Sequence, residues 1–167
     1  MPPRATRANL GYLLAKASQR WNELLYEGFV REGYPEVRPS YGSVLIPLFE
    51  EDGLRMGEIA ERARLSKQTI TTMVRLCERD GLVTRRPDPD DGRASRVAMT
   101  RKARAFQPAA ERVLAELEAA VRDLLGERRV ASLRDSARQV ADLASAAERS
   151  GDGIEPSKRG AATPCRL

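Results

Sequence analysis

Apolar residues recur at intervals of three and four over three long segments, the spacing that places them on one face of a helix. The first segment, residues 9–32, carries Leu10, Leu14, Ala17, Trp21, Leu24 or Leu25, and Gly28. The second, which Thr100 can cap, carries Phe106, Ala110, Val113, Leu117, Ala120 and Leu124. The third follows Gly126 and carries Val130, Leu133, Ala137, Val140, Leu143 and Ala147. These patterns predict one amphipathic helix at the start of the chain and two toward its end.

Shorter elements are expected in the middle of the chain. Glycine and proline in residues 33–39 end the first helix. A second helix is predicted to start near Ser40 and to kink at Pro47, which lacks the amide hydrogen that a helix uses. Its inward side chains would be Tyr41, Val44, Leu45, Leu48 and Phe49. Residues 54–55 can then form a very short strand, and residues 57–63 a helix of about two turns.

The next segment predicts a helix followed by a hairpin. Ser66 is a good N-cap, because its hydroxyl can accept a hydrogen bond from an otherwise unpaired amide of the first turn. The helix should run to Asp80, since Gly81 can adopt the left-handed conformation that ends helices. Residues 82–99 alternate in character around a turn rich in proline, aspartate and glycine, and this pattern indicates two paired strands.

The order of these elements predicts the fold. Two short helices joined by a short link and followed by a hairpin form a winged helix-turn-helix. We expect a mainly α protein: a winged helix-turn-helix with a two-stranded wing, and a helical dimerisation domain formed by the N- and C-terminal helices. Residues 1–149 would form one unit, with dimerisation helices in 9–38 and 100–149 and the DNA-binding region in 40–99. Residues 150–167 lack periodicity and are predicted to be a disordered tail.

The helix that starts at Ser66 has two chemically different faces. One face carries Ile70, Met73, Val74 and Cys77. The opposite face carries Gln68, Thr72, Arg75 and Arg79, with Thr71 at its edge. These polar groups can contact base edges: glutamine pairs with adenine, arginine with guanine, and a threonine methyl with thymine. A solvated surface helix would have a similar composition, so the neighbouring hairpin is what favours DNA.

Charge points to the same region. The chain carries a net charge of +5, from 29 basic and 24 acidic side chains. Residues 61–104 hold 12 basic and 6 acidic side chains, a net charge of +6. A basic excess confined to one segment is typical of nucleic-acid-binding surfaces, although an ordinary solvated face could have the same charge.

The expected wing combines arginines with an acidic tip. The arginines are Arg85, Arg86, Arg93 and Arg96, and the acids are Asp88, Asp90 and Asp91. Carboxylates repel phosphates, so the acids need an explanation. Asp91 can hold the guanidinium of Arg93 in an extended pose suited to a narrow minor groove. Aspartate and proline are also good turn formers, which is the simpler interpretation.

Two motifs stand out in this region: the helix end LCERDGLV at residues 76–83 and the wing element DGR at residues 91–93. With the run LSKQTITTMVRLCERDGLVTRRPDPDDGRASRVAMT, residues 56–104 resemble the MarR family of bacterial transcription regulators. The flanking helices extend this resemblance over residues 9–148. It implies an obligate homodimer that binds pseudo-palindromic operators. In many members a small-molecule pocket lies between the dimer domain and the winged domain.

The resemblance has two departures. Arg64 stands where a glycine is usual in the turn between the two short helices, at a cost of about 1 kcal/mol if its backbone is left-handed. Met56 stands where serine or threonine usually caps the first of these helices. The start of that helix is therefore expected to be weakly specified.

We therefore predict a homodimeric, sequence-specific regulator that represses or activates transcription by occupying double-stranded operator DNA. Repression is the favoured alternative, and a small-molecule effector could release the protein from DNA. Its recognition helix, residues 66–80, would enter the major groove and its wing, residues 82–99, the minor groove. The residues expected at the DNA are Ser66, Lys67, Gln68, Thr69, Thr71, Thr72, Arg75, Arg85, Asp91, Arg93 and Arg96. Three aromatic residues, more often plain core at this spacing, are candidates for an effector pocket: Trp21, Tyr26 and Tyr41.

Composition excludes several other classes. The chain has no histidine and two cysteines, which argues against the common nucleophile systems and against a zinc site. We predict no enzyme activity, no metal and no cofactor. No apolar run approaches the length of a membrane span, so a cytoplasmic protein is expected. Cys77 lies on the inward face and is predicted to be structural, while Cys165 falls in the tail. The alternative to operator recognition is a winged-helix adaptor that binds protein or RNA.

Overall fold

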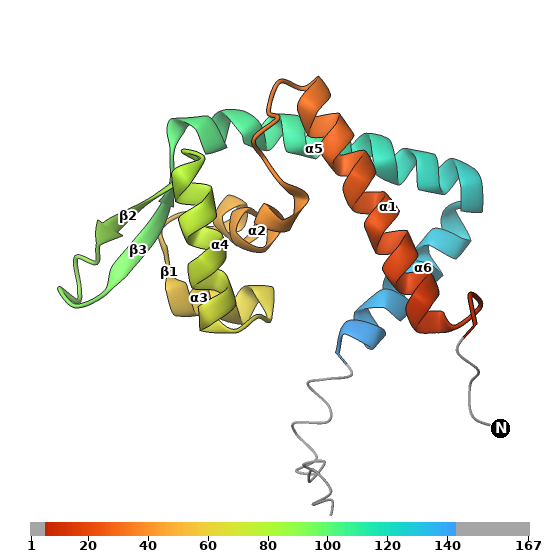
Figure 1. Ribbon diagram of the computed structural model, residues 1–167, viewed down its shortest axis with the longest axis horizontal. Helices are drawn as coiled ribbons and strands as arrows, with labels where there is room; N and C mark the ends of the chain where they lie inside the picture. Colours follow the sequence, from red (N-terminus) through yellow and green to blue (C-terminus); the bar gives the residue numbers. More distant parts are fainter. Residues whose placement is uncertain (1–5, 143–167) are drawn as a thin grey trace, which may run out of the picture. The chain divides into compact units, whose positions relative to one another are not determined.

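The computed structural model describes residues 6–142, which form mostly helices and one small antiparallel sheet. The elements are α1 (Leu10–Arg31), the 3-10 helix η1 (Pro39–Tyr41), α2 (Gly42–Glu50), β1 (Leu54–Arg55), α3 (Met56–Ala63), α4 (Lys67–Arg79), β2 (Val83–Pro87), β3 (Ser95–Met99), α5 (Arg101–Leu125) and α6 (Glu127–Ala141) (Figure 1). The described residues divide into two compact units, with the boundary between Ala120 and Val121. The predicted mainly α, winged helix-turn-helix architecture is confirmed.

Side-chain caps fix the starts of three helices. Asn9 accepts a hydrogen bond from the amide of Gly11 at the start of α1, at 2.9 Å. Ser66 Oγ accepts one from the amide of Thr69 at 3.1 Å, which confirms it as the N-cap of α4. Thr100 Oγ1 accepts one from the amide of Ala103 at 3.2 Å, as predicted for the start of α5. Each hydroxyl or amide oxygen satisfies an amide that has no partner within its helix.

The start of α3 differs from the expectation. Met56 offers no capping oxygen, but the carboxylate of Glu58, the third residue of the helix, accepts a hydrogen bond from the amide of Arg55 at 2.6 Å. This is one half of a capping box. The sequence interpretation considered Met56 alone, which is the first residue of the helix and not its cap, and missed the contact of Glu58 with the amide of Arg55.

The turn between α3 and α4 adopts the conformation that the family resemblance implies. Arg64 has φ 53° and ψ 41°, in the left-handed region. Among the described residues it is the sole non-glycine residue with a positive φ. The conditional cost of about 1 kcal/mol for a side chain at this position therefore applies. Gly81, with φ 75°, ends α4 in the predicted way.

The sheet has the strand order β1-β3-β2. In the predicted hairpin, Val83 pairs with Met99 and Pro87 with Ser95. The short strand predicted at residues 54–55 is also confirmed, and it pairs with the other edge of β3. The hairpin projects beyond α3 and α4 in Figure 1. Strand β1 therefore connects the wing to the start of α3, because it pairs with β3 and is followed directly by that helix.

The core of the first unit joins α1, α2, α4 and α5 around aromatic and branched side chains. Phe106 receives the rings of Phe29 and Tyr34 edge-on, each at a centroid distance of 5.0 Å. Gly28 allows α1 to approach α5 closely, since a Cβ there would lie 2.3 Å from Cγ1 of Val113. The inward residues predicted for α2 are buried or packed on this core, and Pro47 lies within that helix.

Two of the predicted apolar stripes are only partly covered. In the first unit, the early turns of α1 leave Leu10 65% and Leu14 43% exposed, although Leu25 and Gly28 further along are buried. In the second unit, α6 has no buried residue, and its Leu133 is 51% exposed. Large apolar side chains left in water are a feature of surfaces that bind a partner.

Part of the sequence interpretation lies outside the described residues. This applies to Leu143 and Ala147 of the predicted last stripe, to the tail at 150–167 and to Cys165. Within the described part of the chain, the search found no helix that could span a membrane.

Candidate nucleic-acid interface

Helix α4 presents its apolar face to the core and its polar face to solvent. Ile70, Val74 and Cys77 are fully buried. The side chains predicted for the opposite face are exposed: Gln68, Thr72, Arg75 and Arg79. The division of the helix into two faces is therefore confirmed, because the 3.6-residue period alone determines which residues the core can receive.

The exposed side chains of α4 differ in whether they make hydrogen bonds or ion pairs within the chain. Within residues 6–142, Lys67, Gln68 and Arg75 make no side-chain hydrogen bond or ion pair. Arg79 instead pairs with Asp80, with Nε 2.9 Å from Oδ1. The first three turns of α4 therefore carry three polar groups whose hydrogen-bonding capacity faces solvent unused.

The threonine hydroxyls of α4 are used within the helix. Thr71 donates to the carbonyl of Lys67 at 2.7 Å, and Thr72 donates to the carbonyl of Gln68 at 3.1 Å. Thr69 Oγ1 lies 2.8 Å from Ser66 Oγ at the cap. Ser66 and Thr69 thus stabilise the start of the helix, whereas Thr72 remains exposed.

Arginines of the wing fall into two groups. Arg85 pairs with Glu78 of α4, with Nη2 2.9 Å from the carboxylate. Arg96 donates to the carbonyl of Gly53 and to Asp90, both at 3.3 Å. Both arginines therefore hold the hairpin to the rest of its unit, and their guanidinium groups are already engaged.

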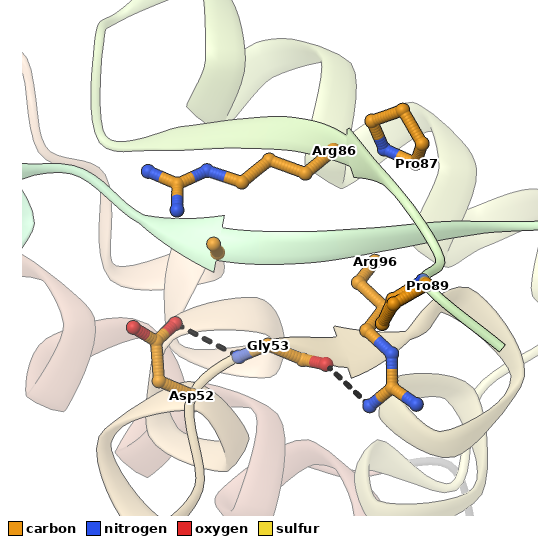
Figure 2. A pocket seen from close by; sticks show the side chains of 7 residues that line it. Asp52, Gly53, Arg86, Pro87, Pro89 and Arg96 are labelled. Atoms are coloured by element: carbon orange, nitrogen blue, oxygen red, sulfur yellow. Dashed lines mark hydrogen bonds between the residues drawn. The ribbon is translucent and has the colours of Figure 1, made fainter.

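The second group consists of Arg86 and Arg93, which are exposed and whose guanidinium groups have no hydrogen-bonding or ionic partner in the described part of the chain. Figure 2 shows the side chain of Arg86 extended along the sheet, while Arg96 turns toward the backbone of Gly53. Both line a hollow of about 270 Å³ beside the sheet. The predicted DNA-contact set omitted Arg86, although it stands in the same basic run as Arg85.

Of the two interpretations of the acidic tip, turn formation and a bond to the Arg93 guanidinium, the contact of Asp91 agrees with turn formation. Asp91 accepts a hydrogen bond from the backbone amide of Arg93 at 3.0 Å. The predicted bond between Asp91 and the Arg93 guanidinium is therefore replaced by a turn contact. This is the usual behaviour of aspartate two residues before an amide.

Asp88 forms the centre of a buried network at the base of the tip. Its Oδ2 accepts a hydrogen bond from Arg55 Nε at 2.5 Å, and its Oδ1 accepts one from the amide of Asp90 at 3.0 Å. Arg96 Nε lies 3.2 Å from Oδ1 but outside hydrogen-bonding geometry. The amide of Asp90 and the Arg55 guanidinium lower the pKa of Asp88 to about 2. A carboxylate therefore fixes the wing tip to the start of α3.

A second network holds the end of α4. Tyr41 donates its phenolic hydrogen to Asp80 Oδ2 at 2.6 Å, and Lys102 donates to the Asp80 carbonyl at 3.0 Å. Burial, followed by the Asp80 carboxylate, raises the pKa of Tyr41 to about 12. Hydrogen bonds from Arg79 and Tyr41 lower the pKa of Asp80. Residues from η1 and α5 thus fix the C-terminal end of α4.

Comparison with known proteins agrees with this geometry. Residues 48–94, which include the turn between the two short helices and most of the wing, match the MarR family. The PcaV transcriptional regulator from Streptomyces coelicolor, solved with its natural ligand, shares 26% identity, with 86% of this chain and 99% of that chain covered and a TM-score of 0.72. The resemblance to the MarR family is confirmed.

Other solved structures extend this result. The transcriptional repressor CouR, bound to a 23-mer DNA duplex, shares 26% identity over 83% of this chain and 99% of that chain, with a TM-score of 0.69. A MarR transcriptional regulator from Methanosarcina mazei Go1 shares the fold at 17% identity over 80% of this chain and 94% of that chain, with a TM-score of 0.66. No curated protein matches the chain in sequence. The chain thus resembles MarR-family regulators through residues 48–94 and through the fold that it shares with these solved structures.

The MarR-like unit contains an apolar cavity of about 90 Å³. Its lining includes Leu25, Phe29, Leu45, Phe49, Phe106 and Leu114. Polar groups enter the lining at Arg38 and Glu111. The cavity lies among residues of α1, α2 and α5.

The three aromatic residues predicted for an effector pocket do not line this cavity. Tyr41 is buried and bonded to Asp80, and Trp21 packs against the core. Tyr26 donates to the carbonyl of Pro35 at 3.1 Å, and the Arg38 guanidinium lies 4.7 Å from the centre of its ring. Which apolar residues border the cavity depends on how the helices pack, and helical spacing alone does not carry this information.

Cys77 has the environment of a structural thiol. It is fully buried on the inner face of α4 beside Ile70 and Val74. Burial raises the pKa of this thiol to about 12. The thiol is therefore protonated at neutral pH, and the thiolate that reacts with oxidants is scarce.

Proposed function

We propose that this chain is a homodimeric, sequence-specific DNA-binding protein that represses transcription by occupying a pseudo-palindromic operator. One observation carries the proposal: the outer face of α4 holds unpaired, exposed Lys67, Gln68 and Arg75 beside a hairpin with unpaired, exposed Arg86 and Arg93. The DNA-bound structure of the similar repressor CouR supports it. Such a regulator would act in the cytoplasm, where it reaches its operator.

The major groove of DNA is about 12 Å wide and admits an α-helix. We infer that α4 enters it, with Lys67 on a phosphate, Gln68 on an adenine edge, and Arg75 on a guanine edge or a phosphate. The exposed polar face of α4 has no acidic side chain in its first three turns. Electrostatic repulsion from the backbone phosphates is therefore small along this face.

The wing would follow the neighbouring minor groove. Arg93, near the tip of the hairpin, can enter a narrow groove, where the negative potential is strongest. Arg86 is the second unpaired cation of the wing and can contact a phosphate. Arg85, Asp91 and Arg96 are proposed to support the wing, because their charged groups already have partners within the chain.

The homodimer is proposed from uncovered apolar residues in each unit taken separately. Leu10, Leu13 and Leu14 of α1 are exposed, and so are Leu133 and Val140 of α6. A second copy of the chain can bury both sets, and a two-fold dimer binds two half-sites related by the same symmetry. The dimerisation helices at 9–38 and 100–149 and the DNA-binding region at 40–99 remain our assignment.

The test is a selection of tight binders from random duplex DNA, followed by titration of the selected duplex and a scrambled one. Gln68→Ala should weaken binding to the selected duplex by about 1–3 kcal/mol per base contact and leave the scrambled duplex unaffected. Gln107→Ala on α5 is the matched control and should change neither affinity. If no duplex is enriched, the adaptor that binds protein or RNA replaces the operator-binding interpretation.

The apolar cavity favours a second property, release from DNA by a small effector. PcaV was solved with its natural ligand, and CouR from Rhodococcus jostii RHA1 was solved with p-coumaroyl-CoA. A cavity of about 90 Å³ is small beside ligand pockets of about 300–1,000 Å³, so an effector must move the side chains that line it. Its lining is apolar except for Arg38 and Glu111, and the guanidinium of Arg38 can pair with a small apolar anion. A panel of such anions, titrated against the protein–operator complex, tests this property.

A further inference from the structure

Thr72 lies on the candidate DNA face, and its hydroxyl hydrogen is already bonded within the helix while its methyl group is free. It is exposed and lies one helical turn after Gln68 and three residues before Arg75, so the three side chains share one face. Its hydroxyl hydrogen is bonded to the Gln68 carbonyl at 3.1 Å. Thr72 therefore cannot donate to a base without losing that bond.

What remains free on Thr72 is its methyl group and the lone pairs of its hydroxyl oxygen. Base pairs in the major groove offer one apolar feature, the 5-methyl group of thymine. A methyl group held rigidly on a helix matches this feature, and a β-branched side chain has little rotational freedom there. Thr71 has the same internal hydrogen bond but is less exposed, at the edge of the face.

We propose that Thr72 is a specificity-determining residue that recognises a thymine through contact between its methyl group and the 5-methyl group of the base. The inference rests on the proposed function, since it requires α4 to lie in the major groove. One turn of helix rises about 5.4 Å, and successive base pairs are about 3.4 Å apart. The thymine is therefore one or two base pairs from the base that Gln68 contacts.

The experiment replaces each thymine of the selected half-site by uracil, one position at a time and symmetrically in both halves. Uracil pairs as thymine does but lacks the 5-methyl group. Burial of one methyl group corresponds to about fourfold in affinity. With two half-sites, wild-type protein should lose about 15-fold at one position and little at the others.

Two variants then separate the methyl group from the hydroxyl group. Thr72→Ser keeps the hydroxyl and removes the methyl, so it should lose about 15-fold on the thymine duplex and be indifferent to uracil. Thr72→Val keeps a methyl and removes the hydroxyl, so it should retain tight binding and the preference for thymine. Thermal unfolding of both variants shows whether a change in affinity reflects folding.

Three results would overturn the inference. Equal affinity for thymine and uracil at every position would show that no thymine methyl is read. An unchanged uracil effect in Thr72→Ser would assign the methyl contact to another residue. Loss of binding in Thr72→Val with retention in Thr72→Ser would show that the hydroxyl is the recognition group. Failure of the proposed function is distinct, because no duplex would then be enriched, and the inference would fall with it.

Discussion

Of the three aspartates at the wing tip, Asp88 is buried, whereas Asp90 and Asp91 are exposed. The sequence alone does not distinguish them, since all three suit a turn. The difference arises from Arg55, which is distant along the chain and reaches Asp88 through the pairing of β1 with β3. Residue-scale roles at this site are therefore set by tertiary contacts rather than by local composition.

The depressed pKa of Asp88 predicts how the wing responds to acid. Its folded-state pKa, about 2, lies below the ordinary value of 3.8. The stability it contributes is therefore complete above pH 3.8 and is lost as the pH falls toward 2. Asp88→Asn should lower the melting temperature at pH 7 and make its decline between pH 4 and pH 2 shallower.

Melting temperatures measured across that pH range test this expectation. Asp123→Asn, at an exposed position of α5, is the control and should follow the wild-type curve. Identical slopes for wild type and Asp88→Asn would contradict the assigned role of the carboxylate.

Cys77 gives a second prediction at the scale of one residue. In Cys77→Ser, a hydroxyl would lie on a fully buried face without a hydrogen-bonding partner provided for it. The variant should unfold with a free energy lower by about 1–3 kcal/mol, measured by denaturant titration. In a Cys165→Ser background, the Cys77 thiol should not react with a thiol reagent until denaturant is added. Rapid reaction in the folded protein, or loss of DNA binding on mild oxidation, would refute the structural role.

At the scale of elements, the close contact between α1 and α5 is set by one glycine. A Cβ at Gly28 would lie 2.3 Å from Cγ1 of Val113. Overpacking of this kind costs about 1–3 kcal/mol, more than the gain in helix propensity from alanine. We expect Gly28→Ala to be destabilising by about 1–2 kcal/mol in denaturant titration, as the balance of these two terms.

The double variant Gly28→Ala with Val113→Ala tests the contact itself. It should be more stable than the sum of the two single changes predicts, by about 0.5–3 kcal/mol. Gly57→Ala is the control and should raise the free energy of unfolding, since its added Cβ would be no closer than 3.6 Å to Lys67 and alanine favours a helix. Strict additivity of Gly28→Ala and Val113→Ala would mean that the helices do not meet at this point.

The sequence predicted elements well where the determinants are local. Ser66 and Gly81 mark the ends of α4 because capping depends on a few neighbouring residues. The apolar and polar faces of α4 were predicted correctly from the 3.6-residue period of a helix. By contrast, the start of α3 depended on Glu58 inside the helix, and the anchoring of Arg96 depended on Gly53, 43 residues away along the chain. Contacts between distant segments leave no periodic trace in the sequence.

Two wing arginines, Arg86 and Arg93, have guanidinium groups without a partner in the described residues, and this leads to a prediction about DNA binding. Arg86→Ala and Arg93→Ala should weaken binding to operator and scrambled duplexes by similar factors. They should also reduce the salt dependence by about one unit of slope for each phosphate that the dimer no longer neutralises. Arg85→Ala is the matched control, because its guanidinium is bonded to Glu78 and should contribute less.

Titrations at three salt concentrations measure these slopes. The outcome that would count against the proposed wing is unchanged affinity of Arg93→Ala for both duplexes. A larger effect for Arg85→Ala than for Arg93→Ala would show that the ion pair with Glu78 opens when DNA binds.

At the scale of the whole molecule, the uncovered stripes lead to a prediction about how the chain assembles. The early turns of α1 and the length of α6 carry large apolar side chains that the described residues of a single chain leave in water. Leu14→Glu and Leu133→Glu place a charge in each stripe independently. We expect each variant to shift the protein from a dimer toward a monomer with the chain mass of 18.5 kDa, measured by light scattering at micromolar concentration.

Leu65→Glu provides the matched control, because Leu65 is also an exposed leucine but lies in the turn between α3 and α4. It should leave the dimer intact. The two stripe variants should also lose more affinity for a pseudo-palindromic operator than for scrambled DNA. In a dimer, binding of one half-site holds the second winged domain near the other half-site, and a monomer lacks this advantage. A wild-type protein that is monomeric at micromolar concentration would remove the basis for two-fold operator recognition. Monomeric variants with unchanged operator affinity would instead show that a single winged domain supplies the specificity.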